Sequence, residues 1–97
     1  MATLHMLSHS PFGDGRLESC LRLLGSWDAV LLCGDAVYAL QQAGAPWASL
    51  QKSGAQVFAL AEDASARAIT AHASATLVDY PAFVQLCLDY DKVNSWL

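Results

Sequence analysis

Apolar runs and mixed apolar-polar stretches alternate along the chain. The runs predict strands, because four to eight consecutive apolar or β-branched residues between turn signals are typical of strands. They lie at Thr3–Leu7, Ala29–Cys33, Gln56–Leu60 and Ala75–Val78, and Val93–Leu97 predicts a short edge strand. The second run is apolar throughout, which is typical of a parallel strand covered on both faces.

Helical patterns fill the intervals between these strands. We expect helices at about Arg16–Leu24, Ala36–Gln42, Asp63–Ile69 and Ala82–Tyr90, and a short helical turn at Trp47–Gln51. Apolar stripes with the spacing of one helix face mark two of them. The stripes are Leu17, Cys20, Leu21 and Leu24 in the first helix, and Phe83, Leu86, Cys87 and Tyr90 in the last.

Turn and cap residues set the expected ends of the helices. Asp14 and Asp63 are expected to cap the first and third helices, since carboxylates at this position accept unpaired backbone N–H groups. Gly44 and Pro46 are expected to end the second helix, and Pro81 suits a first turn. Strands that alternate with helices predict one α/β domain over residues 1–97, with helices on both faces of a mainly parallel sheet of four or five strands. The order of the strands stays open.

The composition adds an expectation about assembly. The chain of 97 residues is 55% hydrophobic and 14% charged, against roughly 25% charged in an average domain. Such a small domain hides only part of its apolar surface, so we expect a partner to cover the rest. A monomer with a dense core is the alternative. The five Lys and Arg residues are scattered and the net charge is −4, which argues against direct binding of nucleic acid.

Several classes of protein are disfavoured by what the sequence lacks. The segment Met1–Leu7 has no basic region before an apolar stretch, as a signal peptide would, and no apolar run approaches the ~18 residues of a membrane span. Three cysteines without Cys-x-x-Cys spacing predict neither a disulfide framework nor a zinc site. We therefore expect a cytoplasmic protein without a metal or cofactor.

Polar residues follow each predicted strand, where parallel sheets bind ligands. They are Ser8, His9 and Ser10, then Gly34 and Asp35, then Glu62 and Asp63, and finally Asp79 and Tyr80. No Gly-x-Gly-x-x-Gly or P-loop motif accompanies them, and no acid pair follows the first strand, which disfavours nucleotide binding and a phospho-acceptor role. We interpret His9 as a turn residue rather than a base beside a serine nucleophile, His5 as an interior or interface residue, and His72 as part of a surface connection.

Cys20 is the candidate catalytic residue. Cys33 and Cys87 lie on apolar segments and are interpreted as small core residues. Cys20 also lies on an apolar stripe, but it is near Arg22 and the turn after the first strand, where a thiolate could be stabilised. A core residue and an activated thiol are both open at this point.

The sequence resembles the TusB/DsrH family along nearly its whole length. The similar segments are Leu4-His5-Met6-Leu7, Ser10-Pro11-Phe12, Leu17-Glu18-Ser19-Cys20-Leu21, Gly34-Asp35-Ala36-Val37-Tyr38-Ala39, Glu62-Asp63 with Ala66-Arg67, Val78-Asp79-Tyr80 with Phe83-Val84, and Trp96-Leu97. Family members often read Ala-Arg-Gly where this chain has Ala66-Arg67-Ala68, so we expect this turn to be helical instead.

This resemblance implies a DsrEFH-like three-layer α/β/α fold and a role in sulfur relay. TusB-like subunits join TusC-like and TusD-like subunits in a heterohexamer, a dimer of trimers. The complex passes persulfide sulfur through a TusE-like carrier toward 2-thiolation of the tRNA wobble uridine, in the synthesis of 5-methylaminomethyl-2-thiouridine. An accessory subunit is the first expectation. A persulfide on Cys20, as the similar DsrEFH complexes of sulfur oxidation imply through their Leu-Glu-Ser-Cys-Leu context, is the alternative.

Overall fold

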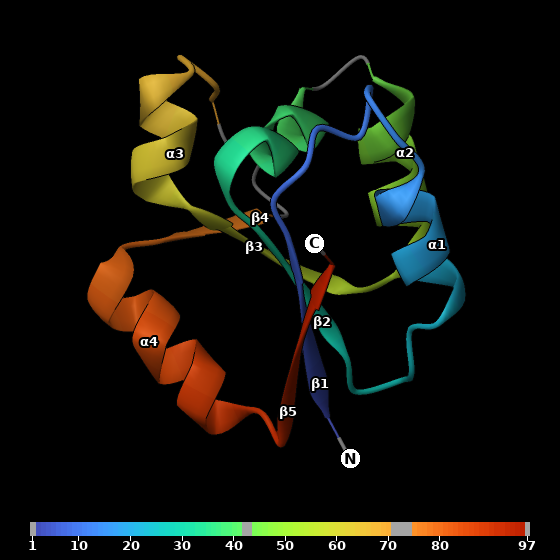
Figure 1. Cartoon of the computed structure of the whole chain (residues 1–97), viewed down its shortest axis with the longest axis vertical. Helices are drawn as coiled ribbons and strands as arrows, with labels where there is room; N and C mark the ends of the chain where they lie inside the picture. Colours follow the sequence, from blue (N-terminus) through green and yellow to red (C-terminus); the bar gives the residue numbers. More distant parts are fainter. Residues whose placement is uncertain (1, 42–43, 71–74, 97) are drawn as a thin grey trace.

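A five-stranded sheet, parallel throughout, forms the centre of the protein (Figure 1). The computed structural model describes residues 2–41, 44–70 and 75–96. The strands are β1 (Thr3–Leu7), β2 (Ala29–Leu32), β3 (Gln56–Leu60), β4 (Ala75–Val78) and β5 (Lys92–Trp96), and their order in the sheet is β4-β3-β2-β1-β5. The chain therefore adds strands in one direction from β1 to β4 and then places β5 on the other side of β1.

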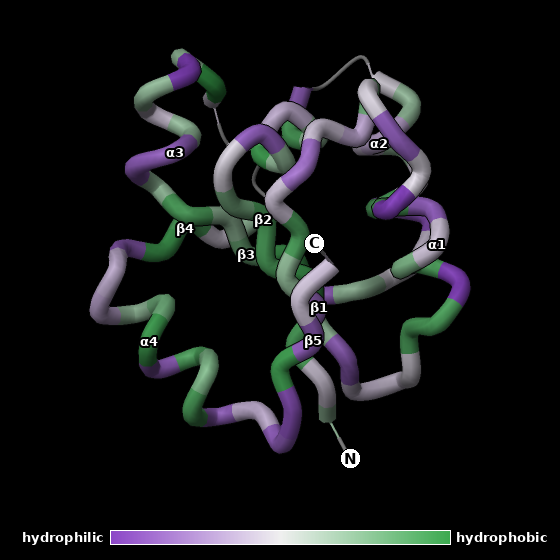
Figure 2. The backbone as a smooth tube through the Cα atoms, viewed as in Figure 1, coloured by the Kyte–Doolittle hydropathy of each residue, from purple (hydrophilic) through white to green (hydrophobic). Residues whose placement is uncertain are grey.

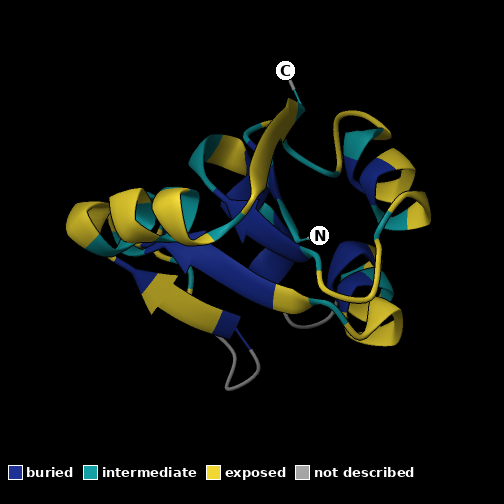
Figure 3. Cartoon of the chain, turned by 90° about the horizontal axis from the view of Figure 1, so that it is seen from below, coloured by how far each residue is buried: buried dark blue, intermediate teal, exposed yellow. Residues whose placement is uncertain are grey.

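Helices cover both faces of this sheet, which confirms the expected three-layer α/β/α architecture. One face carries α1 (Arg16–Arg22), the 3-10 helix η1 (Gly34–Leu40), α2 (Ala45–Ser53) and α3 (Ala61–Ala66), whose buried residues share one core cluster. The other face carries α4 (Tyr80–Asp89), which packs on a second cluster. Figure 3 shows the buried sheet between these two exposed outer layers.

The two core clusters explain why the strands read as apolar runs. All four residues of β2 are buried, since β2 lies in the middle of the sheet between two helical layers. Leu4 and Leu31 face α4, whereas Leu7, Val30 and Leu32 face the larger helical layer. Both predicted helix stripes are confirmed: Cys20 of the first points into the larger cluster, and Phe83, Leu86, Cys87 and Tyr90 pack on the smaller one.

The structure corrects several predicted helix ends. Pro46 lies in the first turn of α2 rather than ending the preceding helix, a position where its missing N–H costs no hydrogen bond. The preceding segment is a 3-10 helix over Gly34–Leu40, while the predicted end at Gln42 lies outside the described residues.

Neither predicted aspartate occupies an N-cap position. Gly15 is the N-cap residue of α1, and Asp14 accepts the Arg16 N–H at 3.0 Å from one position earlier. Asp63 lies inside the first turn of α3, whose N-cap residue is Leu60. The carboxylate of Asp63 is therefore available to a neighbouring segment of the fold. Asp79 does cap its helix, accepting the Ala82 N–H at 2.9 Å.

The turn after α3 is left-handed, not helical as expected. Ala68 has φ of 54°, and the N–H groups of Ala68 and Ile69 return to the Ser65 and Ala64 carbonyls at 3.1 and 2.9 Å. This is the Schellman pattern, in which glycine usually occupies the left-handed position. Here an alanine Cβ occupies a conformation that costs about 1–2 kcal/mol.

Replacing Ala68 with Gly should stabilise the protein. We expect a gain of about 0.5–1 kcal/mol, because relief of the strained conformation exceeds the added flexibility of the unfolded chain. Urea denaturation measures the difference, and Ala66→Gly in α3 serves as the control, with an expected loss of up to about 1 kcal/mol. Equal losses in both variants would contradict the assigned strain.

Two further properties concern the described residues alone. None of their helices has the length and apolar character needed to cross a bilayer. Nor do three or more of their His, Cys, Asp and Glu side chains gather in an arrangement that could hold a metal ion.

Candidate functional site

The carboxyl ends of β2 and β3 are joined by a clasp of charged and backbone groups. Gly34, just after β2, donates its N–H to Asp63 Oδ2 at 2.7 Å. Gly34 has φ of 51°, and a Cβ there would lie 3.2 Å from the Ser8 carbonyl oxygen, so only glycine fits without strain. The displacement of Asp63 from the cap position is what allows this contact between η1 and α3.

Arg67 completes the clasp from the end of α3. Its Nε and Nη2 donate to Asp35 Oδ1 at 3.1 and 2.9 Å, and its Nη1 donates to the Asp63 carbonyl at 3.2 Å. Arg67 Nη1 also lies 4.0 Å from Asp63 Oδ1, four residues earlier in the sequence, and the guanidinium lies 6.0 Å from the centre of the Tyr38 ring. The structure thus joins Gly34, Asp35 and Asp63 in one clasp, in which the single positive charge of Arg67 offsets part of the charge of two acids.

The other polar residues that the sequence singled out do not take part in this clasp. His9 is exposed in the loop after β1, and Glu62 is exposed on α3. Asp79 is occupied as the cap of α4. His72 lies outside the described residues. The sequence therefore predicted the polar edge correctly, but the side chains there serve mainly to hold elements together.

The three cysteines differ in their surroundings. Cys20 is 0% exposed on the inner side of α1. Burial raises the pKa of its thiol to about 12, and the Asp28 carboxylate adds to this effect. Cys33 lies just past β2 rather than inside it, and its Sγ donates to the Leu7 carbonyl at 3.4 Å. Burial, and then Asp63, raise the pKa of Cys33 as well. Cys87 is half-buried on the side of α4 that faces the sheet.

A partly buried chain of hydrogen bonds links β5, β1 and the segment just before β2. The Trp96 indole donates to His5 Nδ1 at 3.1 Å, and His5 Nε2 lies 3.2 Å from Asp28 Oδ2. Because Nδ1 accepts the indole proton, Nε2 carries the imidazole hydrogen and donates to the carboxylate. The expectation that His5 is an interior residue is confirmed, since it is 5% exposed.

Asp28 is the acceptor at one end of this series of hydrogen bonds. It was not among the site residues predicted from the sequence. It also accepts the N–H groups of Thr3 and Gly25 at 2.9 and 2.8 Å. Burial raises the pKa of Asp28, but the hydrogen bonds from Gly25, Thr3 and His5 outweigh it and leave the pKa below its ordinary value. No motif marks this residue, because two of its three partners, Thr3 and His5, lie in β1, 25 and 23 residues away along the chain. Only its position directly before the second apolar run hinted at a role.

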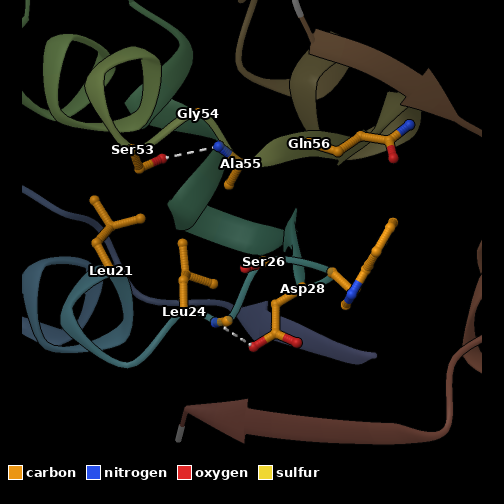
Figure 4. A pocket seen from close by; sticks show the side chains of 10 residues that line it. Leu21, Leu24, Ser26, Asp28, Ser53, Gly54, Ala55 and Gln56 are labelled. Carbon is orange, nitrogen blue, oxygen red and sulfur yellow. Dashed lines mark hydrogen bonds between the residues drawn. The ribbon is translucent and has the colours of Figure 1, made fainter. Parts of the chain in front are cut away.

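A pocket of about 490 Å³ opens beside Asp28, at the amino ends of β2 and β3 (Figure 4). Its walls come from the end of α1 with the loop that follows it, and from the turn between α2 and β3. The carboxylate of Asp28 accepts the Gly25 N–H at 2.8 Å, and Figure 4 places Gln56 on another wall of the pocket. Ligands of parallel sheets bind at the opposite, carboxyl end of the strands, so this pocket is not where such a site is expected.

Comparison with known proteins gives the family. Residues 9–93 match the family of DsrH like proteins. Protein TusB of Erwinia tasmaniensis is 39% identical over 95 residues, which cover 96% of this chain and 99% of that protein. Protein TusB of Enterobacter sp. strain 638 is 36% identical with the same coverage. The ychN protein from E. coli has the same fold, with a TM-score of 0.78 at 18% identity over 99% of this chain and 100% of that one. The chain therefore belongs to the DsrH family, as the resemblance of its sequence to TusB/DsrH proteins indicated.

Proposed function

We propose that the chain is an accessory subunit of a sulfur-relay complex in the cytoplasm. It assembles with TusC-like and TusD-like subunits as a heterohexamer, a dimer of trimers. Persulfide sulfur leaves the complex through a TusE-like carrier toward 2-thiolation of the tRNA wobble uridine, in 5-methylaminomethyl-2-thiouridine synthesis. The match to DsrH like proteins over residues 9–93, and TusB relatives over nearly the full chain, support this assignment.

The burial of Cys20 is the observation that carries the accessory role. A sulfur acceptor must present a thiolate to the donor. Cys20 is 0% exposed, and burial raises the pKa of its thiol to about 12, so the thiol stays protonated near neutral pH. Its side chain instead fills the space between α1 and the sheet with Leu17 and Val30. The contribution of this chain is then to complete the assembly while another subunit holds the sulfur.

The alternative is that Cys20 itself accepts sulfur, and its Leu-Glu-Ser-Cys-Leu context favours it. In this step the Cys20 thiolate attacks the outer sulfur of a donor persulfide. The donor S–S bond breaks, its electron pair leaves on the donor thiolate, and a new S–S bond forms on Cys20, so no oxidant is needed. Because Sγ is buried, α1 would first have to lift from the sheet.

Substitution of Cys20 separates the two roles. For an accessory subunit, we expect the assembled complex with Cys20→Ala to transfer sulfur within about twofold of the natural complex, since no chemistry is lost. Cys20→Ser should cost about 1–3 kcal/mol of stability, because it buries a hydroxyl among apolar groups. Mass spectrometry of the complex after incubation with a persulfide donor should show no added sulfur on this chain.

Cys87→Ala is the matched control, because Cys87 lies on the inner side of α4, on the opposite face of the sheet from Cys20. It should alter stability alone. A mass gain of one sulfur atom on this chain, present with Cys87→Ala and absent in both Cys20 variants, would establish the persulfide role instead.

A further inference from the structure

The outer side of α4 carries an exposed apolar stripe. Tyr80, Val84 and Leu88 are four residues apart and therefore lie along one side of the helix. They are 48%, 56% and 74% exposed, while no residue of α4 is fully buried. Along the tube of Figure 2, apolar and polar residues alternate through this helix. The helix therefore places apolar side chains toward the sheet and also away from it.

The charges around this stripe have one sign. Asp79, Asp89 and Asp91 flank it, and residues 75–91 contain no Lys or Arg. Each of these carboxylates accepts a hydrogen bond from a neutral N–H: Asp79 from Ala82, Asp89 from Gln85 and Asp91 from Ala2. These bonds leave the negative charges in place. The stripe thus has an apolar centre and an acidic rim.

The edge strand β5, which two residues separate from the end of α4, exposes one further apolar side chain. Val93 pairs with Leu4 in the register and lies on the α4 side of the sheet, where it is 39% exposed. Lys92 alternates with it and lies on the other side. Three exposed side chains fall short of the roughly 800 Å² that each partner buries in a stable interface, so a contact must extend from α4 toward β5.

The acidic rim around the α4 stripe argues against a second copy of the chain as the protein that binds there. A symmetric contact would bring two sets of three acids together, and like charges across an interface oppose association. Four of the five cations (Arg16, Arg22, Lys52 and Arg67) lie on or next to α1, α2 and α3 in the opposite layer, where the clasp already engages Arg67. A partner must therefore supply basic residues that this chain does not have at its own stripe.

We propose that Tyr80, Val84 and Leu88 of α4, with Val93 of β5, form the docking surface for a different protein subunit whose contact patch is apolar with a Lys- and Arg-rich rim. This inference rests on the proposed function, in which the chain works only as part of a hetero-oligomer. The apolar side chains supply the burial, and the acidic rim selects the partner and disfavours self-association.

Co-purification of the chain with TusC-like and TusD-like subunits from the same cell tests this surface. Val84→Gln combined with Leu88→Gln should weaken association at least about 10-fold, because apolar contact is replaced by amides that must be desolvated. Asp89→Lys should also weaken it, and association of the natural chain should fall as salt is raised. Leu23→Gln, a residue 66% exposed at the end of α1, is the matched control and should bind normally.

The outcomes separate this surface from the proposed function. If the natural chain does not co-purify with these subunits, both proposals fail. If it does, and the double variant with an unchanged circular dichroism spectrum binds as tightly as Leu23→Gln, the surface alone is wrong. A dimer of the isolated chain in analytical ultracentrifugation that dissociates with Leu88→Gln would identify a second copy as the occupant and overturn the choice of partner.

Discussion

Leu4→Ala should lower the free energy of unfolding by about 3–4 kcal/mol. Leu4 is 0% exposed in β1, between β2 and β5, and packs with Leu31 and Phe58 beneath α4. Removing its three outer carbons leaves a cavity that flat neighbouring strands cannot fill. The loss is a large part of the 5–15 kcal/mol that stabilises a typical domain. Urea denaturation of the purified chain, followed by tryptophan fluorescence, measures it.

Leu77→Ala is the matched control for this prediction. Leu77 is also a strand leucine, but it lies on the edge strand β4 and is 43% exposed. Its truncation should cost about 1 kcal/mol or less, since much of the side chain already faces solvent. Equal urea midpoints for the two variants would contradict the burial of Leu4 and the central place of β1 in the sheet.

Asp28→Ala should lower the free energy of unfolding by about 3 kcal/mol. The change removes the acceptor of the Thr3 and Gly25 N–H groups and of His5 Nε2, and the donors of Thr3 and His5 are partly shielded from water. A donor left without a partner costs more than the hydrogen bond contributes, which is why the loss is expected to be large. Asp28→Asn is the matched control, because its one remaining carbonyl oxygen keeps part of the network, and about half the loss is expected.

The pH dependence of stability gives a second measurement on Asp28. Its pKa is lowered on folding, so the stability that it contributes is fully present above the pKa of about 3.9 of an unfolded Asp. It is lost as the pH falls from that value through the lower folded pKa. The difference in unfolding free energy between the natural chain and Asp28→Asn should therefore shrink as the pH drops below about 4. A difference that stays constant from pH 6 down to pH 2.5 would contradict this assignment.

The sequence alone was sufficient for the architecture of the chain. Because a strand covered on two faces must be apolar throughout, the run at Ala29–Cys33 predicted a parallel strand buried on both faces, and β2 is such a strand over Ala29–Leu32. The stripes on α1 and α4 identified the helix sides that face the core for the same reason. The ends of helices were predicted less well, as Pro46 and Asp63 show, because one residue type serves both to begin and to end elements.

The candidate site could likewise be predicted only in part from the sequence. That polar residues gather at the carboxyl ends of the strands follows from chain direction and could be predicted. That Asp63 binds the Gly34 N–H and Asp35 binds Arg67 could not, because these pairs are 29 and 32 residues apart and meet only when β2 and β3 are neighbours.

The role of Cys20 also depended on the tertiary structure. Its place on an apolar stripe predicted the side of α1 on which it lies. The same spacing, however, fits both a core residue and an activated thiol near the turn after the first strand. The packing of α1 on the sheet decides between the two, and it leaves Cys20 fully buried beside Leu17.

The hydrogen bonds among Asp28, His5 and Trp96 join residues as far apart in the sequence as 5 and 96. Local pattern determined which elements form, because hydrogen bonding and burial along one helix or strand are local. Only the packed sheet decided which side chains meet, because contacts between distant segments depend on strand order, which no local pattern encodes.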